Sequence, residues 1–231
     1  MSLSYIKENL AAVAREIALA EEAAGRAGKT QMLAAVKYGS PEELRALLAA
    51  GVTHVGENRV QQLLEHIPIL QEAGARIHFI GSLQTNKVKY IIDKVEMIHS
   101  VDSQRLAAEI CKRAKQHGTV MDVLVEINAA REEAKSGVLP EEAEALCREI
   151  LAMDGLRLCG FMTMGPVLES REAYRAYFTQ VRELAFSLWE RLSLTGEPLL
   201  SMGMSQSFGP AIEAGADLVR VGRRLFAHDP S

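Results

Sequence analysis

The chain has 231 residues, a formal net charge of −4 at pH 7 and a pI near 5.9. That length suits one α/β domain, because barrels of this class run to about 200–250 residues. The acidic balance gives no reason to expect a nucleic-acid partner, since phosphate neutralisation needs a concentrated basic face. No apolar run approaches the roughly 18 residues of a membrane span, so we expect no membrane partner either.

The N-terminus and the cysteines bear on the compartment. The first eight residues, MSLSYIKE, have neither the basic nor the apolar region of a secretory signal. Cys111, Cys147 and Cys159 are odd in number and lack CxxC spacing, which favours a reducing setting over a disulfide or zinc framework. These features predict a cytoplasmic protein.

The predicted elements start with an amphipathic helix, in which Ile6, Leu10, Val13 and Ile17 recur at helical spacing. It should end near Gly25 or Gly28. A short apolar strand over 32–36 follows. The segment 40–43, Ser-Pro-Glu-Glu, then supplies an N-cap, a proline at the first helical position and a capping-box glutamate.

The same unit of apolar strand, polar or glycine-bearing loop and amphipathic helix recurs along the chain. Strands are predicted over 32–36, 53–55, 76–80, 97–99, 120–127, 156–161, 199–202 and 217–221. The intervening helices are predicted over 41–50, 58–73, 84–93, 103–117, 140–152, 171–192 and 206–214. Pro68 should kink or end the second of these helices.

Eight strands that alternate with helices favour a parallel sheet closed into a (β/α)8 TIM-type barrel, preceded by an extra N-terminal helix. A doubly wound open sheet is the alternative, but no GxGxxG follows the first strand. Nothing in the composition divides the chain, so a single barrel domain over 1–231 is expected.

Lys37 stands at the end of the first predicted strand. An apolar strand would leave its ammonium poorly hydrated and free the amine as a nucleophile, whose usual chemistry is a Schiff base with an aldehyde. The ordinary alternative is a lysine that caps the strand and extends to water.

Two loops at the end of the chain suggest an anion site. Ser201-Met202-Gly203-Met204-Ser205 ends the seventh predicted strand, and Arg220-Val221-Gly222-Arg223-Arg224 ends the eighth. Glycine allows the backbone to approach an anion, Ser205 adds a hydroxyl, and Arg220 or Arg223 adds a charged contact. Phosphate sites in such barrels favour the loops after strands seven and eight. The alternative is that the glycines only form turns and the arginines are solvated.

An amine and a phosphate site at one mouth predict a ligand with an aldehyde and a phosphate. Pyridoxal 5′-phosphate (PLP) fits, and so does a phosphosugar bound by a class I aldolase. No metal is expected, because none of the six histidines forms an HxH or HExxH pair; core or surface roles are favoured for them. Four methionines are typical of core packing and could also line a flat ring's pocket: Met162, Met164, Met202 and Met204.

Several strings together resemble the PLP homeostasis protein family, also called the YggS/PROSC family. They are Lys37 at its strand end, Gly56-Glu57-Asn58-Arg59-Val60-Gln61, the segment from Ile77 to Lys87 (IHFIGSLQTNK), Lys135-Ser136-Gly137, Gly160-Phe161-Met162-Thr163-Met164, Ser201-Met202-Gly203-Met204-Ser205 and Val219-Arg220-Val221-Gly222. The resemblance spans nearly the whole chain. It implies the barrel of the alanine racemase N-terminal domain.

The resemblance also implies roles for individual residues. Lys37 would form the internal aldimine, and Asn58 would lie near the cofactor. Ser205, Gly222 and Arg223 would occupy the phosphate positions, with Met204 beside them. Arg220 would face the pyridine nitrogen, where a guanidinium cannot accept the ring proton and leaves the ring a weaker electron sink.

The sequence departs from the family pattern at some positions. Arg223 stands where the family commonly has threonine, and Ser207 stands where aspartate is frequent. Val36 and Tyr38 flank the lysine in place of serine and threonine. None of these changes removes the lysine, so they affect the expected phosphate contacts rather than cofactor binding.

Racemisation needs an acid or base on each face of the cofactor adduct. Alanine racemases are expected to take the second group from a C-terminal β-domain, whereas this chain ends at Ser231. We therefore expect a monomeric PLP-binding protein that stores or delivers the cofactor, with PLP-dependent apoenzymes as recipients and no established catalytic residue. A PLP-dependent racemase or lyase and a class I aldolase-like enzyme remain the alternatives.

Overall fold

The computed structural model describes residues 3–228, and its eight parallel strands close into a barrel in which each strand pairs with the next and β8 returns to β1. The strands are β1 (Gln31–Ala35), β2 (His54–Glu57), β3 (Arg76–Phe79), β4 (Met97–Val101), β5 (Met121–Glu126), β6 (Leu156–Met162), β7 (Leu199–Met204) and β8 (Leu218–Val221). The predicted (β/α)8 barrel is confirmed, and the open sheet is excluded because β1 pairs with β8.

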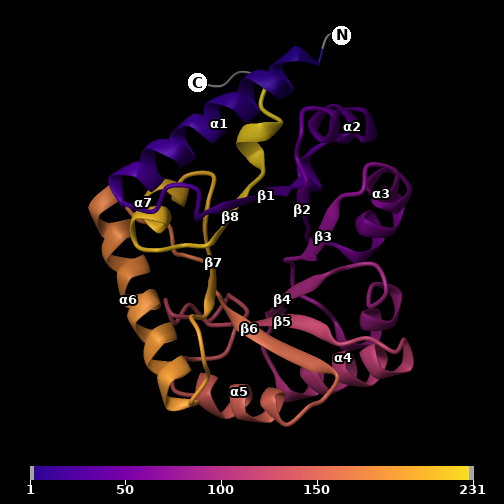
Figure 1. The fold of residues 1–231 in the computed structure, drawn as a ribbon, viewed down its shortest axis with the longest axis vertical. Helices are drawn as coiled ribbons and strands as arrows, with labels where there is room; N and C mark the ends of the chain where they lie inside the picture. Colours follow the sequence, from indigo (N-terminus) through magenta and orange to yellow (C-terminus); the bar gives the residue numbers. More distant parts are fainter. Residues whose placement is uncertain (1–2, 229–231) are drawn as a thin grey trace.

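The helices form a ring outside the strands (Figure 1). They are α1 (Ser4–Ala23), α2 (Pro41–Ala49), α3 (Val60–Glu72), α4 (Gln104–Gln116), α5 (Ala143–Leu151), α6 (Arg171–Arg191) and α7 (Phe208–Glu213). The predicted capping box of α2 is present: Ser40 Oγ accepts from the backbone N–H of Glu43, whose carboxylate accepts from the N–H of Ser40. None of the helices within 3–228 is long and apolar enough to cross a membrane.

The extra helix α1 is packed against the end of the barrel where β8 leads into its last turn (Figure 1). Asn9 fixes it there, because its side-chain amide donates to the carbonyl oxygens of Leu225 at 3.3 Å and Ala227 at 2.8 Å. Ile6, Val13 and Ile17 are buried beneath it. The predicted amphipathic face of this helix is therefore its packing face.

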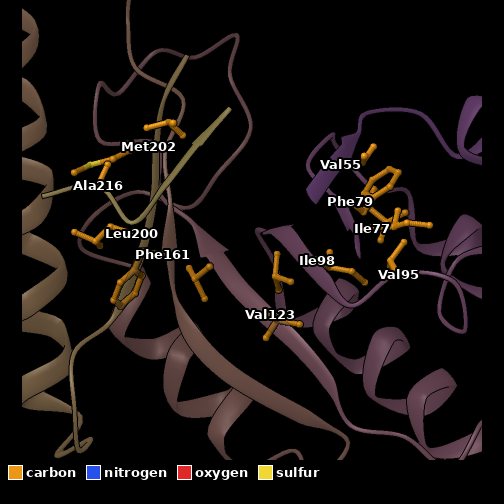
Figure 2. Close-up of a cluster of buried hydrophobic side chains, with 14 of the residues drawn as sticks. Val55, Ile77, Phe79, Val95, Ile98, Val123, Phe161, Leu200, Met202 and Ala216 are labelled. Atoms are coloured by element: carbon orange, nitrogen blue, oxygen red, sulfur yellow. The ribbon is translucent and has the colours of Figure 1, made fainter. Parts of the chain in front are cut away.

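Outward-facing strand residues pack against the helices. Figure 2 shows part of this layer, in which Val55, Phe79, Ile98, Val123 and Phe161 lie among other buried apolar side chains. Because side chains alternate along a strand, the residues between them face the barrel axis. This outer layer is the main hydrophobic core.

The inside of the barrel is more varied. Two small apolar clusters lie there: Leu33, Ala35 and Ile80 form one, and Met97, Leu124 and Met162 form the other. Alternation also turns a set of buried polar residues inward: His78, His99, Glu126, Ser201 and Arg220. Polar groups thus fill much of the space beneath the carboxyl ends of the strands.

Some local expectations are wrong. Residues 84–93 form a 3₁₀ turn over Thr85–Tyr90 rather than an α-helix, and α3 continues through Pro68 to Glu72. The first strand ends at Ala35, and the chain then enters a 3₁₀ turn over Val36–Tyr38. That turn carries Lys37 out of the sheet, so the expectation that the strand buries it is wrong, and Lys37 is exposed.

Candidate functional site

A cavity of about 600 Å³ opens at the mouth where the strands end at their carboxyl termini. This volume lies in the range of small-molecule sites, roughly 300–1,000 Å³. Its wall contains all seven predicted cofactor residues: Lys37, Asn58, Met204, Ser205, Arg220, Gly222 and Arg223. Residues from both ends of the chain therefore meet around one space.

Lys37 reaches this cavity from the 3₁₀ turn that follows β1. Its Nζ atom lies 5.0 Å from the centre of the Tyr38 ring, a distance at which an ammonium is attracted to the ring face. No salt bridge binds its amine within residues 3–228. The amine is thus placed at the mouth without a carboxylate partner.

The loop between β7 and α7 is shaped by an irregular register. Ser201 pairs with Leu218 and Met204 with Arg220, so β7 uses one residue more than β8 over this stretch. Gly203 lies in this bulge with φ +91°, a conformation that favours glycine. The bulge lets Met204 and Ser205 both line the cavity.

The hydroxyl of Ser207 closes the same loop, since it accepts a hydrogen bond of 3.2 Å from the Met204 N–H. Ser207 N–H in turn donates to Met204 O at 2.8 Å. Within the described part of the chain, the backbone N–H groups of Ser205 and Gln206 have no hydrogen-bond partner. Unpaired N–H groups in such a loop are suited to bind an anion.

The end of β8 completes this anion-binding corner. Gly222 N–H donates to Ser205 Oγ at 3.3 Å, which joins the two loops. A Cβ at Gly222 would lie 2.8 Å from Ala35 O and 3.0 Å from the Tyr38 ring, so only glycine fits this close approach. Arg223 is exposed at the mouth and makes no ion pair within residues 3–228, whereas Arg224 pairs with Glu16.

Arg220 lies on the floor of the cavity and is almost fully buried. One terminal nitrogen donates to both the carbonyl oxygen and the hydroxyl of Ser201 at 2.7 Å, and the other donates to Thr163 O at 2.8 Å. Its Nε–H makes no hydrogen bond to any described residue, and it is the donor left for a ligand. A nitrogen acceptor on a flat ring would suit this position.

The charge of Arg220 is maintained although it is buried. Burial lowers its pKa to about 10, while Glu126 acts in the opposite direction, so the guanidinium is cationic at neutral pH. Burial and the nearby Asp102 raise the pKa of Glu126 to about 7, against the effect of Arg220. For both groups, desolvation outweighs their mutual attraction.

The remaining predicted residues line the walls. Asn58 follows β2, and its Oδ1 atom is buried without a partner among the described residues. An orphaned acceptor of this kind needs a donor, which a ligand's hydroxyl can supply. Met164 and Met204 line the cavity, whereas Met162 and Met202 pack in apolar clusters. The four methionines thus divide between the two roles expected of them.

The wall contains no carboxylate, imidazole or thiol among the described residues. Its titratable side chains belong to Lys37, Tyr38 and Tyr174 and to the three arginines at 220, 223 and 224. The cavity is therefore cationic and suited to an anionic ligand. Within residues 3–228, no group of three His, Cys, Asp or Glu side chains could hold a metal ion.

Sequence reasoning missed the polar residues below the floor. His78, His99, Ser201 and Glu126 are buried inside the barrel, and the first three form hydrogen bonds that lead to Arg220. The signal that could have found them is alternation, because Ile77 and Phe79 bracket His78, and Val219 and Val221 bracket Arg220.

Comparison with known proteins first defines the class of this barrel. A family model described as "Alanine racemase, N-terminal domain" matches residues 9–230. The match covers nearly the whole barrel, and it confirms the fold family that the sequence strings implied.

Similar proteins then define the family more narrowly. A "Pyridoxal phosphate homeostasis protein" of Aquifex aeolicus (strain VF5) is 44% identical over 220 residues, which are 95% of this chain and 96% of that protein. The chain belongs to the family of the pyridoxal phosphate homeostasis proteins.

Solved structures agree with this assignment. An unknown protein from Bifidobacterium adolescentis has a TM-score of 0.86 and 35% identity, and the match covers 97% of this chain and 95% of that one. PipY of Synechococcus elongatus PCC7942, solved with PLP bound, has a TM-score of 0.84 and 27% identity, over 96% of this chain and 100% of PipY.

Proposed function

We propose that this protein binds PLP in the cavity at the barrel mouth and holds it on Lys37 for storage or delivery. The observation that carries the proposal is that the lysine, the anion-binding corner and the Arg220 Nε–H all line one cavity. The similarity to PipY and to the homeostasis protein of Aquifex aeolicus supports PLP as the ligand.

The residues present fit the parts of PLP. Lys37 Nζ adds to the aldehyde carbon and water leaves, so that a C=N bond joins protein and cofactor. The N–H groups of Ser205 and Gln206, with the Arg223 guanidinium, bind the phosphate. Arg220 donates its Nε–H to the pyridine nitrogen, and Asn58 Oδ1 accepts from the ring hydroxyl.

When bound, PLP supplies an electron sink for chemistry at the α-carbon of amino acids. Use of that sink requires proton transfer near neutral pH, for which carboxylates and imidazoles are the common groups. The cavity wall offers neither among the described residues. An arginine at the pyridine nitrogen also keeps the ring unprotonated and weakens the sink. Both features favour retention of the cofactor over turnover of a substrate.

Replacement of Lys37 tests the proposal. Wild-type protein incubated with PLP should absorb in the visible range, and borohydride should fix PLP to it. Lys37→Ala should do neither. Lys87→Ala is the matched control, because Lys87 is an exposed lysine on the neighbouring 3₁₀ turn that does not line this cavity; it should behave as the wild type. Wild-type protein that does not take up PLP would contradict the proposal.

Turnover is measured separately. Protein loaded with PLP should racemise or decarboxylate amino acids far below the roughly 1 per second of ordinary enzymes. Turnover at ordinary rates would instead favour a racemase or lyase. Covalent trapping of a phosphosugar without uptake of PLP would favour an aldolase-like enzyme.

Delivery also makes a checkable demand. We propose PLP-dependent apoenzymes as the recipients and a monomer in the cytoplasm as the carrier. An apoenzyme mixed with loaded protein should recover activity faster than the same apoenzyme mixed with Lys37→Ala protein and an equal total amount of PLP. Light scattering of the loaded protein should give the mass of one chain, 25.3 kDa.

A further inference from the structure

A chain of hydrogen bonds runs through the barrel interior beneath the cavity floor. Arg220 donates to Ser201 Oγ at 2.7 Å, Ser201 Oγ lies 3.0 Å from His99 Nδ1, and His99 Nε2 lies 2.9 Å from His78 Nδ1. All four side chains are at least 95% buried. They come from β8, β7, β4 and β3, so the chain crosses the inside of the barrel.

The chemistry of these groups sets the direction of every bond. A guanidinium can only donate, so Ser201 Oγ accepts from Arg220, and its own hydrogen is available to His99 Nδ1. His99 then carries its proton on Nε2 and donates to His78 Nδ1. His78 in turn carries its proton on Nε2, which has no partner among the described residues. The hydrogen bonds therefore all point away from Arg220.

This direction requires both histidines to be neutral, and burial keeps them so. Desolvation, with the cationic side chains nearby, lowers the pKa of His78 to about 4 and that of His99 well below its usual value. A proton added to His99 Nδ1 would replace its acceptor with a donor and break the bond to Ser201. The neutral rings thus add no charge to an interior that already contains the Arg220 cation.

The chain has a consequence for the guanidinium. Ser201 and Thr163 hold both of its terminal nitrogens, which fixes the plane of the group and directs Nε–H to the cavity. Ser201 could not hold its hydroxyl in the accepting orientation without an acceptor for its own hydrogen, and His99 is that acceptor. His99 is in turn fixed by His78.

We propose that Ser201 and His99, supported by His78, are positioning residues that fix the Arg220 Nε–H as the donor to the ring nitrogen of a bound cofactor. The donor role of Arg220 rests on the proposed function, whereas the direction of the hydrogen bonds does not. The two parts can therefore be tested separately.

The direction of the chain is tested without PLP. Nitrogen-15 NMR of histidine-labelled wild-type protein should show His99 and His78 as neutral rings protonated on Nε2, with no titration between pH 5.5 and 8. An Nδ1-protonated His99, or one that titrates near pH 6.5, would overturn the chain whatever the protein does with PLP.

The effect on the cofactor is tested with Ser201→Ala, which removes the hydroxyl and leaves the backbone carbonyl. We expect the Kd for PLP to rise about tenfold, the loss of one hydrogen bond to a charged group. The pH at which the visible band of bound PLP fades should also fall, because a ring nitrogen free to take a proton withdraws electrons from the imine. His99→Gln should act in the same direction by about threefold.

His54→Asn is the matched control. The His54 ring lies 5.8 Å from that of His78 in the same barrel and makes no hydrogen bond to the chain. Its Kd for PLP and its visible band should match the wild type. If wild-type protein binds PLP on Lys37 while Ser201→Ala and His99→Gln keep its Kd and spectrum, the positioning role is wrong and the proposed function stands. If the wild type does not bind PLP, the proposed function fails, and the NMR result still decides the chain.

Discussion

The two faces of one sheet differ sharply in this barrel. Outward-facing strand residues such as Phe79, Val123 and Phe161 are apolar and pack against the helices. The inward face carries His78, His99, Ser201, Glu126 and Arg220 among a few apolar side chains. Side-chain alternation therefore assigns stability to the outer face and the chemistry of the site to the inner face.

Truncation of the outer layer should have the largest effect on stability. Phe79→Ala and Phe161→Ala each remove a buried ring and should lower the free energy of unfolding by about 3–5 kcal/mol. Chemical denaturation measures this loss. The folded fraction should bind PLP with the wild-type Kd, whereas Ser201→Ala on the inner face should weaken binding with little loss of stability.

Val167→Ala is the control for these variants, because that side chain is 90% exposed. It should leave the free energy of unfolding within about 0.5 kcal/mol of the wild type. A loss of PLP affinity in Phe79→Ala as large as that in Ser201→Ala would remove the distinction between the two faces.

The inner face should instead respond to pH. The pKa of His78 is about 4 in the folded chain and about 6.5 in an unfolded one. The unfolded chain therefore binds the proton first as the pH falls, and stability is lost from about pH 6.5 down to pH 4. The difference corresponds to roughly 3 kcal/mol at full protonation of the unfolded state.

Urea unfolding at pH 7.5 and pH 4 checks this expectation. His78→Gln cannot take the proton, so it should lose up to about 3 kcal/mol less than the wild type between these pH values. Phe79→Ala should show the same acid loss as the wild type, because the outer face carries no comparable group at that position. Equal acid losses in His78→Gln and the wild type would contradict the buried neutral ring.

A local contact outside the barrel should have the smallest effect. Ser40→Ala removes the N-cap of α2 and should cost about 1 kcal/mol in the free energy of unfolding. Ser40→Asp keeps a capping oxygen and should restore most of that loss. Because the cap lies just after the turn that carries Lys37, PLP affinity in the folded protein should be unchanged in both variants.

Much of the fold could be predicted because its signals are local and repeated. The alternation of apolar strands with amphipathic helices predicts eight strands, and Ser40, Pro41 and Glu43 predict the start of α2. The 3₁₀ turn over Val36–Tyr38 could not be read in this way, because nothing in an apolar run tells where the sheet stops pairing. The exposure of Lys37 follows from that turn.

The candidate site shows a similar division. Gly222, Ser205 and Arg223 could be placed together because barrels bring the last two strand ends to one mouth. The buried chain from Arg220 to His78 could not, since its members lie on four strands and meet only after closure. A histidine in isolation reads as a core or surface residue, and only the register identifies its neighbours.

The pairing of β1 with β8 has one more consequence. Lys37 belongs to the first strand unit and Gly222 and Arg223 to the last, so a growing polypeptide on the ribosome exposes the amine long before the anion contacts exist. A ligand that needs both halves can bind only after the ring has shut. Retention of PLP would therefore report completion of the barrel during synthesis, and it would separate a finished molecule from one whose final strand has not yet docked.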